Sequence, residues 1–161
     1  MKSWNEFSLE EPELANLGKQ MLFKAKAHTG LAFLATIRKD GAPRLHPICL
    51  VISHDRLYVF ISPSSPKCAD LKRDGRYALQ AFPPTENEEG REFYLSGVAN
   101  CIQDPSTCQV IKAETGIYVE EGEVLFELFL CQAMYTMLLD RGTSSERPWH
   151  RIWQTPAQRH A

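Results

Sequence analysis

The stretch LAFLATIRKDGAPRLHPICLVIS, residues 31–53, decides how this chain is expected to fold. Residues 31–38 are apolar and too compact for a helix, and residues 43–53 form a second run rich in β-forming side chains. Asp40-Gly41 between them is a strong signal for a tight hairpin turn. The stretch therefore predicts two antiparallel strands.

Further strands are expected downstream at residues 57–62, 76–82 and 92–103. The polar loop PPTENEEG separates the last two, and Gly97 inside the final strand predicts a bulge or a bend. Five strands joined by tight turns favour an antiparallel barrel or sandwich over a parallel α/β sheet.

Helices are expected at both sides of this β region. The first covers about residues 12–28, with Pro12 in its first turn and Gly30 able to terminate it. A second covers residues 105–115. We expect both to flank the β structure as covering helices.

The apolar segments 124–130 and 132–139 do not reveal their type, because short apolar runs suit strands and helices alike. We favour a strand pair or one long bent strand, which would supply the sixth member of a barrel.

Composition sets limits on the class of protein. The 161 residues are 43% hydrophobic and 24% charged, which is typical of a single soluble globular domain spanning residues 1–161. The N-terminus has no apolar signal region, and the most apolar stretch, 124–139, is too short for a membrane span and contains Glu127. We therefore expect a cytoplasmic protein without a membrane partner.

Cysteine and histidine spacing does not predict a metal site. The five cysteines are odd in number and no two have the Cys-x-x-Cys spacing. The five histidines are also scattered along the chain.

Charge is distributed unevenly along the chain. Residues 38–76 contain eight Lys or Arg against four Asp, whereas residues 77–161 contain six against twelve acidic residues. A net charge of −2 argues against non-specific nucleic-acid binding. The basic middle suits a small anion, although a solvated rim of turn residues would look the same.

The segment ISPSSPKCADLKRDGR, residues 61–76, follows the third expected strand and leads into a short helix. Short hydroxyls and one lysine before a helix N-terminus are the donors and charge that a phosphate prefers. A capped turn with a solvated lysine is the alternative interpretation.

Taken in order, three stretches resemble one known family: LAFLATIRKDGAPRLHPICLV, LYVFISPSSPKCADLKRDGRYAL and FYLSGVA. They are similar to the pyridoxamine 5′-phosphate oxidase-like, FMN-binding split-barrel superfamily, over roughly residues 15–140. The resemblance implies a mainly β fold with flanking helices, built on a six-stranded antiparallel split barrel. It also implies a homodimer that holds FMN in the groove between its protomers.

The resemblance assigns cofactor-binding roles to particular residues of this chain. It places Arg44, Ser65 and Lys67 at the flavin phosphate and Ile61 and Ser62 beside the ribityl chain. The backbone at the flavin ring edge would come from three further residues, which are His46, Pro47 and Ile48.

Two features depart from the family pattern. Many members have an arginine where this chain has Pro66, so one phosphate contact would be missing or supplied by Arg73 or Arg76. The C-terminal tail, about 141–161, contains RPWHRIW, which does not follow the order of the Trp/Arg/His signature that binds pyridoxal phosphate in true pyridoxamine phosphate oxidases.

If this tail is a strand, Trp149 and Trp153 share one face with Arg151. The two indoles would then either lie near the partner's flavin or pack against the barrel.

The expected function is an FMN-dependent oxidoreductase in which the flavin carries the redox chemistry. No side chain stands out as a catalytic acid or base, the substrate is unknown, and NADH or NADPH is the reductant to test. A deazaflavin or a pyridoxamine phosphate in place of FMN are alternatives within the same class. A flavin- or haem-binding carrier without turnover and a ligand-free dimerising barrel are the alternatives outside it.

Overall fold

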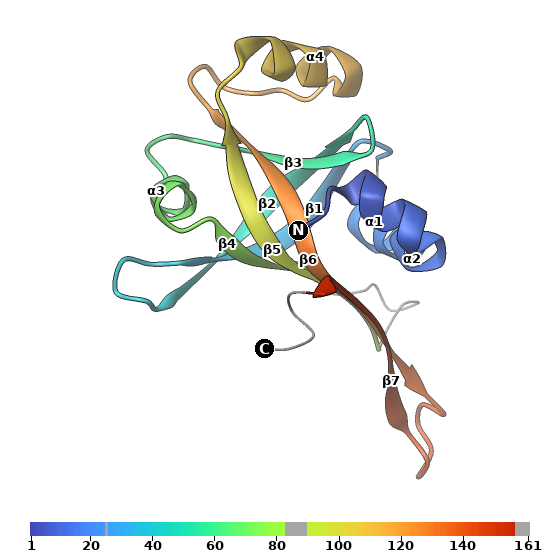
Figure 1. Ribbon diagram of the computed structural model, residues 1–161. Coiled ribbons are helices and arrows are strands. Elements are labelled where there is room, and N and C mark those ends of the chain that lie inside the picture. Colours follow the sequence, from blue (N-terminus) through green and yellow to red (C-terminus); the bar gives the residue numbers. More distant parts are fainter. Residues whose placement is uncertain (25, 83–89, 157–161) are drawn as a thin grey trace.

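The computed structural model describes residues 1–24, 26–82 and 90–156, which form four helices and seven strands (Figure 1). The helices are α1 (Trp4–Glu10), α2 (Pro12–Leu22), α3 (Pro66–Arg73) and α4 (Pro105–Thr115). The strands are β1 (Thr29–Ile37), β2 (Pro43–Ser53), β3 (Arg56–Ile61), β4 (Arg76–Ala81), β5 (Arg91–Ile102), β6 (Val124–Leu139) and β7 (Arg147–Gln154).

Six of these strands close into an antiparallel barrel. The described strands hydrogen-bond in the order β3-β2-β1-β4-β5-β6, and the pairing of β3 with β6 completes the ring. Strand β7 pairs only with β6 within the described residues and lies outside the ring. The expected six-stranded barrel with flanking helices is confirmed.

The β1–β2 hairpin forms where the sequence predicted it. Gly41 has φ +83°, a conformation that glycine adopts at little steric cost, and its N–H donates to the Arg38 carbonyl at 2.9 Å. Strands β1 and β2 pair from Thr29 with Val51 to Ile37 with Pro43.

The ambiguous segment 124–139 is one continuous strand, β6. Opposite Gly97 the register of β5 on β6 shifts by one residue, which is the predicted bulge. A Cβ atom at Gly97 would lie 1.8 Å from the Phe129 carbonyl oxygen, so only glycine allows the two backbones to approach this closely.

The expected helix over residues 12–28 starts at Pro12 as predicted, but its predicted end is wrong. An additional helix, α1, precedes it and is capped by a reciprocal pair of contacts between Ser3 and Glu6. Helix α2 stops at Leu22, and Gly30 is part of β1 instead of a helix terminator. A Cβ atom at Gly30 would lie 2.1 Å from the Leu22 carbonyl oxygen, so glycine here lets β1 start directly against the end of α2.

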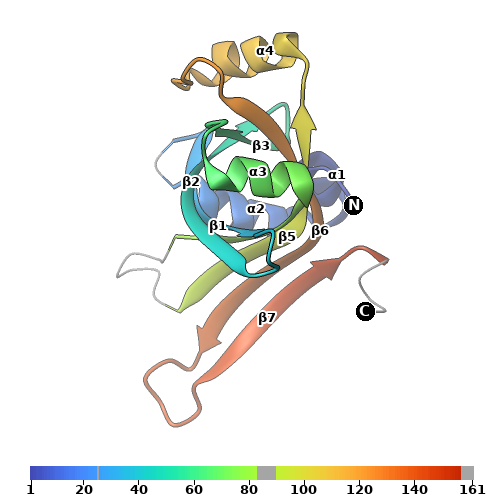
Figure 2. The same ribbon diagram turned by 90° about the vertical axis from the view of Figure 1, so that its left-hand side faces the viewer.

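The helices surround the barrel on several sides. Helices α1 and α2 lie on one side of the barrel and α3 lies on the opposite side, as the two views of Figures 1 and 2 show. The core joins α1 and α2 to the barrel interior through fully buried side chains, among them Trp4, Phe7, Leu34, Phe93 and Phe126.

The C-terminal tail folds as the strand β7, which forms a hairpin with the second half of β6. This arm extends away from the barrel (Figures 1 and 2), and most of β7 is exposed. Within the described part of the chain, no helix combines the length and the apolar character that crossing a membrane requires.

Candidate functional site

The serine segment forms the loop between β3 and α3. The Ser62 and Ser64 hydroxyls lie 2.9 Å apart, and the Ser65 N–H donates to the Ser62 carbonyl at 3.0 Å. Ser65 is the N-cap of α3, but its side chain makes no capping hydrogen bond. Pro66 occupies the first turn, where a missing N–H costs nothing. The loop thus presents hydroxyl groups at a helix N-terminus.

Arg44 on β2 forms an ion pair with Asp70 of α3, with 2.8 Å between Nε and Oδ2. Asp70 is buried at 3% exposure and also accepts a hydrogen bond from the Thr36 hydroxyl at 3.0 Å. Arg73 donates to the other oxygen of the same carboxylate at 3.3 Å. This network, Thr36–Asp70–Arg44–Arg73, fixes α3 against β1 and β2.

The same network controls the ionisation of Asp70. Burial by itself would raise the pKa of this carboxyl, but hydrogen bonds from Arg44, Thr36 and Arg73 outweigh burial and lower the pKa below its usual value. A carboxyl with a lowered pKa stabilises the fold above its ordinary pKa of about 3.9. That contribution is lost as the pH falls through the lowered value.

His46 lies two residues beyond Arg44 on the same face of β2. Its Nε2 atom is buried and has no hydrogen-bond partner in the described part of the chain. Burial lowers the pKa of His46, and the positive charges of Lys67 and Arg44 lower it further. Arg44 and Lys67 thus lie near enough to His46 for their charges to act on it.

Lys67 differs from the arginines around it because its charge is not neutralised. It forms no salt bridge with any residue in the ranges 1–24, 26–82 and 90–156. Arg44 and Arg73 share Asp70, and Arg76 pairs with Asp74 at 2.7 Å. Among the described residues at this end of α3, Lys67 is thus the cation that has no carboxylate partner and can interact with a ligand.

These ion pairs decide whether Arg73 or Arg76 can supply the phosphate contact of the arginine that Pro66 replaces. Arg73 donates to the Ile37 carbonyl as well as to Asp70, and Arg76 holds Asp74 with two guanidinium nitrogens. Since each is engaged by a neighbouring carboxylate, neither replaces the missing family arginine without breaking an existing ion pair.

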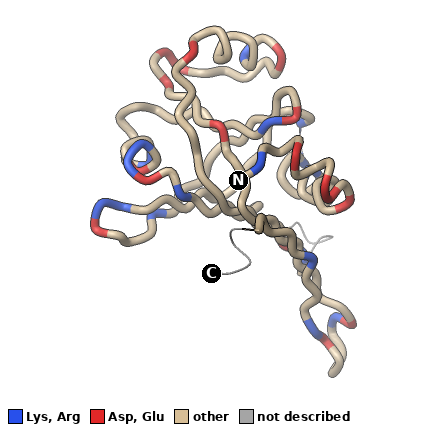
Figure 3. The backbone as a smooth tube through the Cα atoms, in the orientation of Figure 1, with Lys and Arg blue, Asp and Glu red and all other residues tan. Residues whose placement is uncertain are grey.

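A cavity of about 460 Å³ lies beside this network, between the β1–β2 turn and α3. It is lined by Arg38, Lys39, Asp40, Arg44 and Asp70. Figure 3 marks Lys and Arg positions in blue, and acidic positions in red, along α3 and at this turn, so the segment that is rich in Lys and Arg in the sequence also comes together in space. The arrangement provides cationic and hydroxyl donors of the kind that bind an anion.

Not all the predicted cofactor residues expose their side chains. Ile48 and Ile61 are buried at 6% and 1% exposure and belong to the core, so only their backbone is available to a ligand. Pro47 is exposed and Ser62 is half-buried.

The two tryptophans of β7 have different surroundings. Trp153 is buried in the core, 4.9 Å from Phe7 between ring centroids, and donates to the Glu10 carboxylate at 3.0 Å. Trp149 is 42% exposed on the arm. The structure therefore favours the packing interpretation for Trp153 and leaves Trp149 accessible to a partner.

Sequence reasoning missed Asp70 and Thr36, which hold Arg44 in place. In the sequence Asp70 is one of four acidic residues among basic ones, and no local pattern indicates that it is buried. Within the described residues, no group of three or more His, Cys, Asp or Glu side chains is placed to hold a metal ion.

No protein-family model matches the sequence, and no curated protein matches it either. Solved structures do share its fold. The pyridoxine phosphate oxidase family protein related to general stress protein 26, from Clostridium acetobutylicum, is 12% identical with a TM-score of 0.57, covering 92% of this chain and 94% of that one.

Two further structures are similar. PhzG from Burkholderia lata, in complex with tetrahydrophenazine-1-carboxylic acid, is 15% identical with a TM-score of 0.54, and the match covers 93% of this chain and 92% of PhzG. A haem-binding protein from Mycobacterium smegmatis is 15% identical with a TM-score of 0.55 over 78% of this chain. The chain spans about half, 53%, of that protein's length. Identities this low show the fold alone.

Proposed function

This chain has the split-barrel fold of pyridoxamine 5′-phosphate oxidase-like proteins, and we propose that it is a homodimeric oxidoreductase that binds FMN. The flavin phosphate would lie at the N-terminus of α3. The observation that carries this proposal is Lys67, a cation without a salt bridge in the described chain, next to the unused hydroxyl of the N-cap Ser65.

Each residue at this surface would have a separate task. Lys67 supplies the main positive charge, Ser65 donates a hydrogen bond, and Arg44 approaches from β2. Arg44 already shares its charge with Asp70, so we assign it mainly to orientation. FMN, when bound, supplies the redox chemistry, and the chain binds and orients it.

The proposed dimer would use the outward face of the β1–β2 hairpin. Leu31 and Leu45 are 58% and 63% exposed, and Pro47 and Cys49 beside them are also exposed. In the described strands β1 and β2, the side chains between residues 31 and 49 that point outward are all uncharged. A contiguous apolar surface of this kind is typical of protein interfaces. A second copy of the chain would cover it and enclose the isoalloxazine ring.

Absorbance of the purified protein tests the cofactor assignment. Flavin bands are expected, and anaerobic addition of NADH or NADPH should bleach them if the protein is an enzyme. A Soret band would instead support a haem carrier, an alternative favoured by the haem-binding structural neighbour. Flavin bands that neither nucleotide bleaches would support a flavin carrier.

A substitution in the apolar face tests the dimer. Leu45→Glu should convert the dimer to a monomer in sedimentation velocity and weaken FMN binding, because a charge opposes burial of this face. Leu9→Glu is the matched control, since Leu9 is 77% exposed on α1, away from the hairpin. A stable wild-type monomer that binds FMN tightly would contradict the arrangement.

FMN binding should be coupled to proton uptake at His46. Its pKa is lowered by burial, Lys67 and Arg44, with Asp70 acting in the opposite direction, and a bound phosphate would raise it. A protonated His46 therefore favours FMN, so its contribution to affinity grows as the pH falls through the bound-state pKa. This increase in FMN affinity levels off below the pKa that His46 has in the FMN-free protein.

The measurement is the FMN dissociation constant from about pH 5 to pH 8 for the wild type and His46→Gln. The phosphate of FMN titrates equally in both, so the ratio of the two constants isolates His46. A ratio that does not change with pH would show that His46 takes up no proton.

A further inference from the structure

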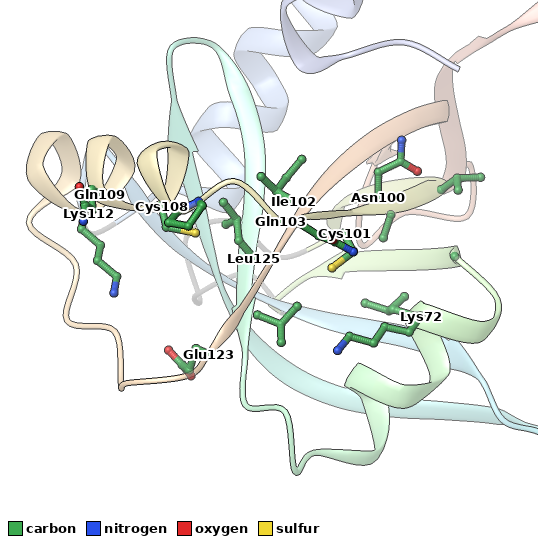
Figure 4. A pocket seen from close by; sticks show the side chains of 16 residues that line it. Lys72, Asn100, Cys101, Ile102, Gln103, Cys108, Gln109, Lys112, Glu123 and Leu125 are labelled. Atoms are coloured by element: carbon green, nitrogen blue, oxygen red, sulfur yellow. The ribbon is translucent and has the colours of Figure 1, made fainter.

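A large groove between α3 and α4 has no part in the proposed flavin site. Its volume is about 1140 Å³, and residues 98–102 of β5, together with Gln103 after the strand, form its floor (Figure 4). The start of β6 closes another side. Small-molecule sites in proteins commonly have volumes of about 300–1,000 Å³. The groove is thus large enough for an organic ligand.

The groove is separate from the proposed phosphate surface. Leu71 and Lys72, in the second half of α3, line the groove, whereas Lys67 at the N-terminus of that helix does not. Arg44 and His46 also do not line it. A ligand in the groove would therefore lie beside the opposite end of α3 from the proposed FMN phosphate.

Aliphatic side chains form one strip of its inner surface. The accessible aliphatic surface comes from half-buried side chains such as Ile102, which packs against the small core cluster that contains Leu125, while Leu71 and Leu125 lie behind it at 3% and 1% exposure. Val98 and Val124 complete this strip. The strip suits the apolar body of a ligand.

Two lysines add uncompensated positive charge. Lys72 from α3 and Lys112 from α4 extend into the groove from opposite sides (Figure 4). Neither forms a salt bridge with a residue that the structure describes. Glu123 is the one carboxylate among the described lining residues, and it accepts a hydrogen bond from the Glu120 N–H at 3.2 Å. The groove therefore carries a net positive charge.

The N-terminus of α4 is not available to bind an anion in the groove. The Asp104 carboxylate accepts hydrogen bonds from the Ser106 and Thr107 N–H groups, so that helix end is already capped by a negative charge. Selection of an anion in the groove thus depends on Lys72 and Lys112.

We propose that this groove is a second ligand site, which binds an organic anion with an apolar body. The apolar part would lie along the aliphatic strip, and a carboxylate, phosphate or sulfonate group would contact one of the two lysines, with the other adding to the positive potential of the groove.

Calorimetry with two naphthalene probes tests this proposal on the purified protein, with and without added FMN. Naphthalene-2-carboxylate should bind, and the neutral 2-naphthylmethanol should bind more weakly. Lys72→Gln or Lys112→Gln, at the lysine that contacts the anion, should weaken binding of the carboxylate by about fivefold, and neither substitution should change binding of the alcohol. Lys39→Gln, on the β1–β2 turn outside the groove, is the matched control.

Alkylation of Cys108 tests whether the carboxylate binds in the groove. Cys108 lines the groove one helical turn before Lys112, so bound carboxylate should slow its modification by iodoacetamide, as followed by mass spectrometry. Equal affinity for carboxylate and alcohol, unchanged affinity in both groove variants, or an unprotected Cys108 would each overturn the proposal. Lys67→Ala should not change the affinity for naphthalene-2-carboxylate. Failure of the proposed groove site can therefore be distinguished from failure of the proposed flavin site.

Discussion

Replacement of Lys67 by alanine is expected to weaken FMN binding roughly tenfold to a hundredfold. Lys67 is half-buried at the start of α3 and makes no salt bridge in the described residues, so its charge would act mainly on the ligand. A charge-assisted hydrogen bond of this kind contributes about 1.5–3 kcal/mol, which gives the stated factor. Fluorescence titration of the apoprotein with FMN measures it.

Riboflavin distinguishes a phosphate contact from a structural effect. Because riboflavin lacks the phosphate, its affinity should be nearly the same in the wild type and Lys67→Ala. Lys19→Ala, which removes a cation of α2 on the opposite side of the barrel from α3 (Figure 1), should change FMN affinity much less. Equal losses for FMN and riboflavin would assign Lys67 a structural role, and unchanged FMN affinity would place the phosphate elsewhere.

Trp153→Ala is expected to lower the free energy of unfolding by about 3–5 kcal/mol, as large-to-small core changes do. Trp153 packs against Phe7 of α1 and donates to Glu10, so the substitution removes contacts between the C-terminal arm and the N-terminal helix. Denaturant unfolding measures this change. Flavin affinity of the remaining folded protein should change little.

Trp149→Ala is the matched control, because Trp149 is 42% exposed four residues away on the same strand. Its effect on stability should lie within about 0.5 kcal/mol. If Trp153→Ala instead keeps its stability and alters flavin fluorescence, the indole serves the cofactor and not the core.

The strands were predictable because their signals are local. Period-two burial and turn residues such as Asp40-Gly41 specify a hairpin without reference to the rest of the chain. Strand β2 accordingly has the predicted bounds, residues 43–53. Helix α4 also has its predicted bounds, residues 105–115, with Pro105 in its first turn and Gly116 as its C-cap. The composition of residues 124–139 suits either secondary structure, and pairing with both β3 and β5 makes them one strand.

The N-terminal helix was mispredicted because its end is set by a contact that is distant in sequence. The apolar periodicity of residues 12–22 is real, but nothing local stops it before Gly30. The stop comes from β1, which starts where its backbone meets the Leu22 carbonyl.

The sequence by itself determined five of the six barrel strands, the serine loop and the single lysine at the start of α3, since turn chemistry and alternation are encoded in neighbouring residues. Only the tertiary structure decided which charges remain available for a ligand. Packing of α3 against β1 and β2 buries Asp70, which neutralises Arg44 and Arg73 and leaves Lys67 without a salt bridge in the described chain. Closure of the arm against α1 likewise buried Trp153 and exposed Trp149, because the two side chains share a face of β7 but lie at different distances from the helix.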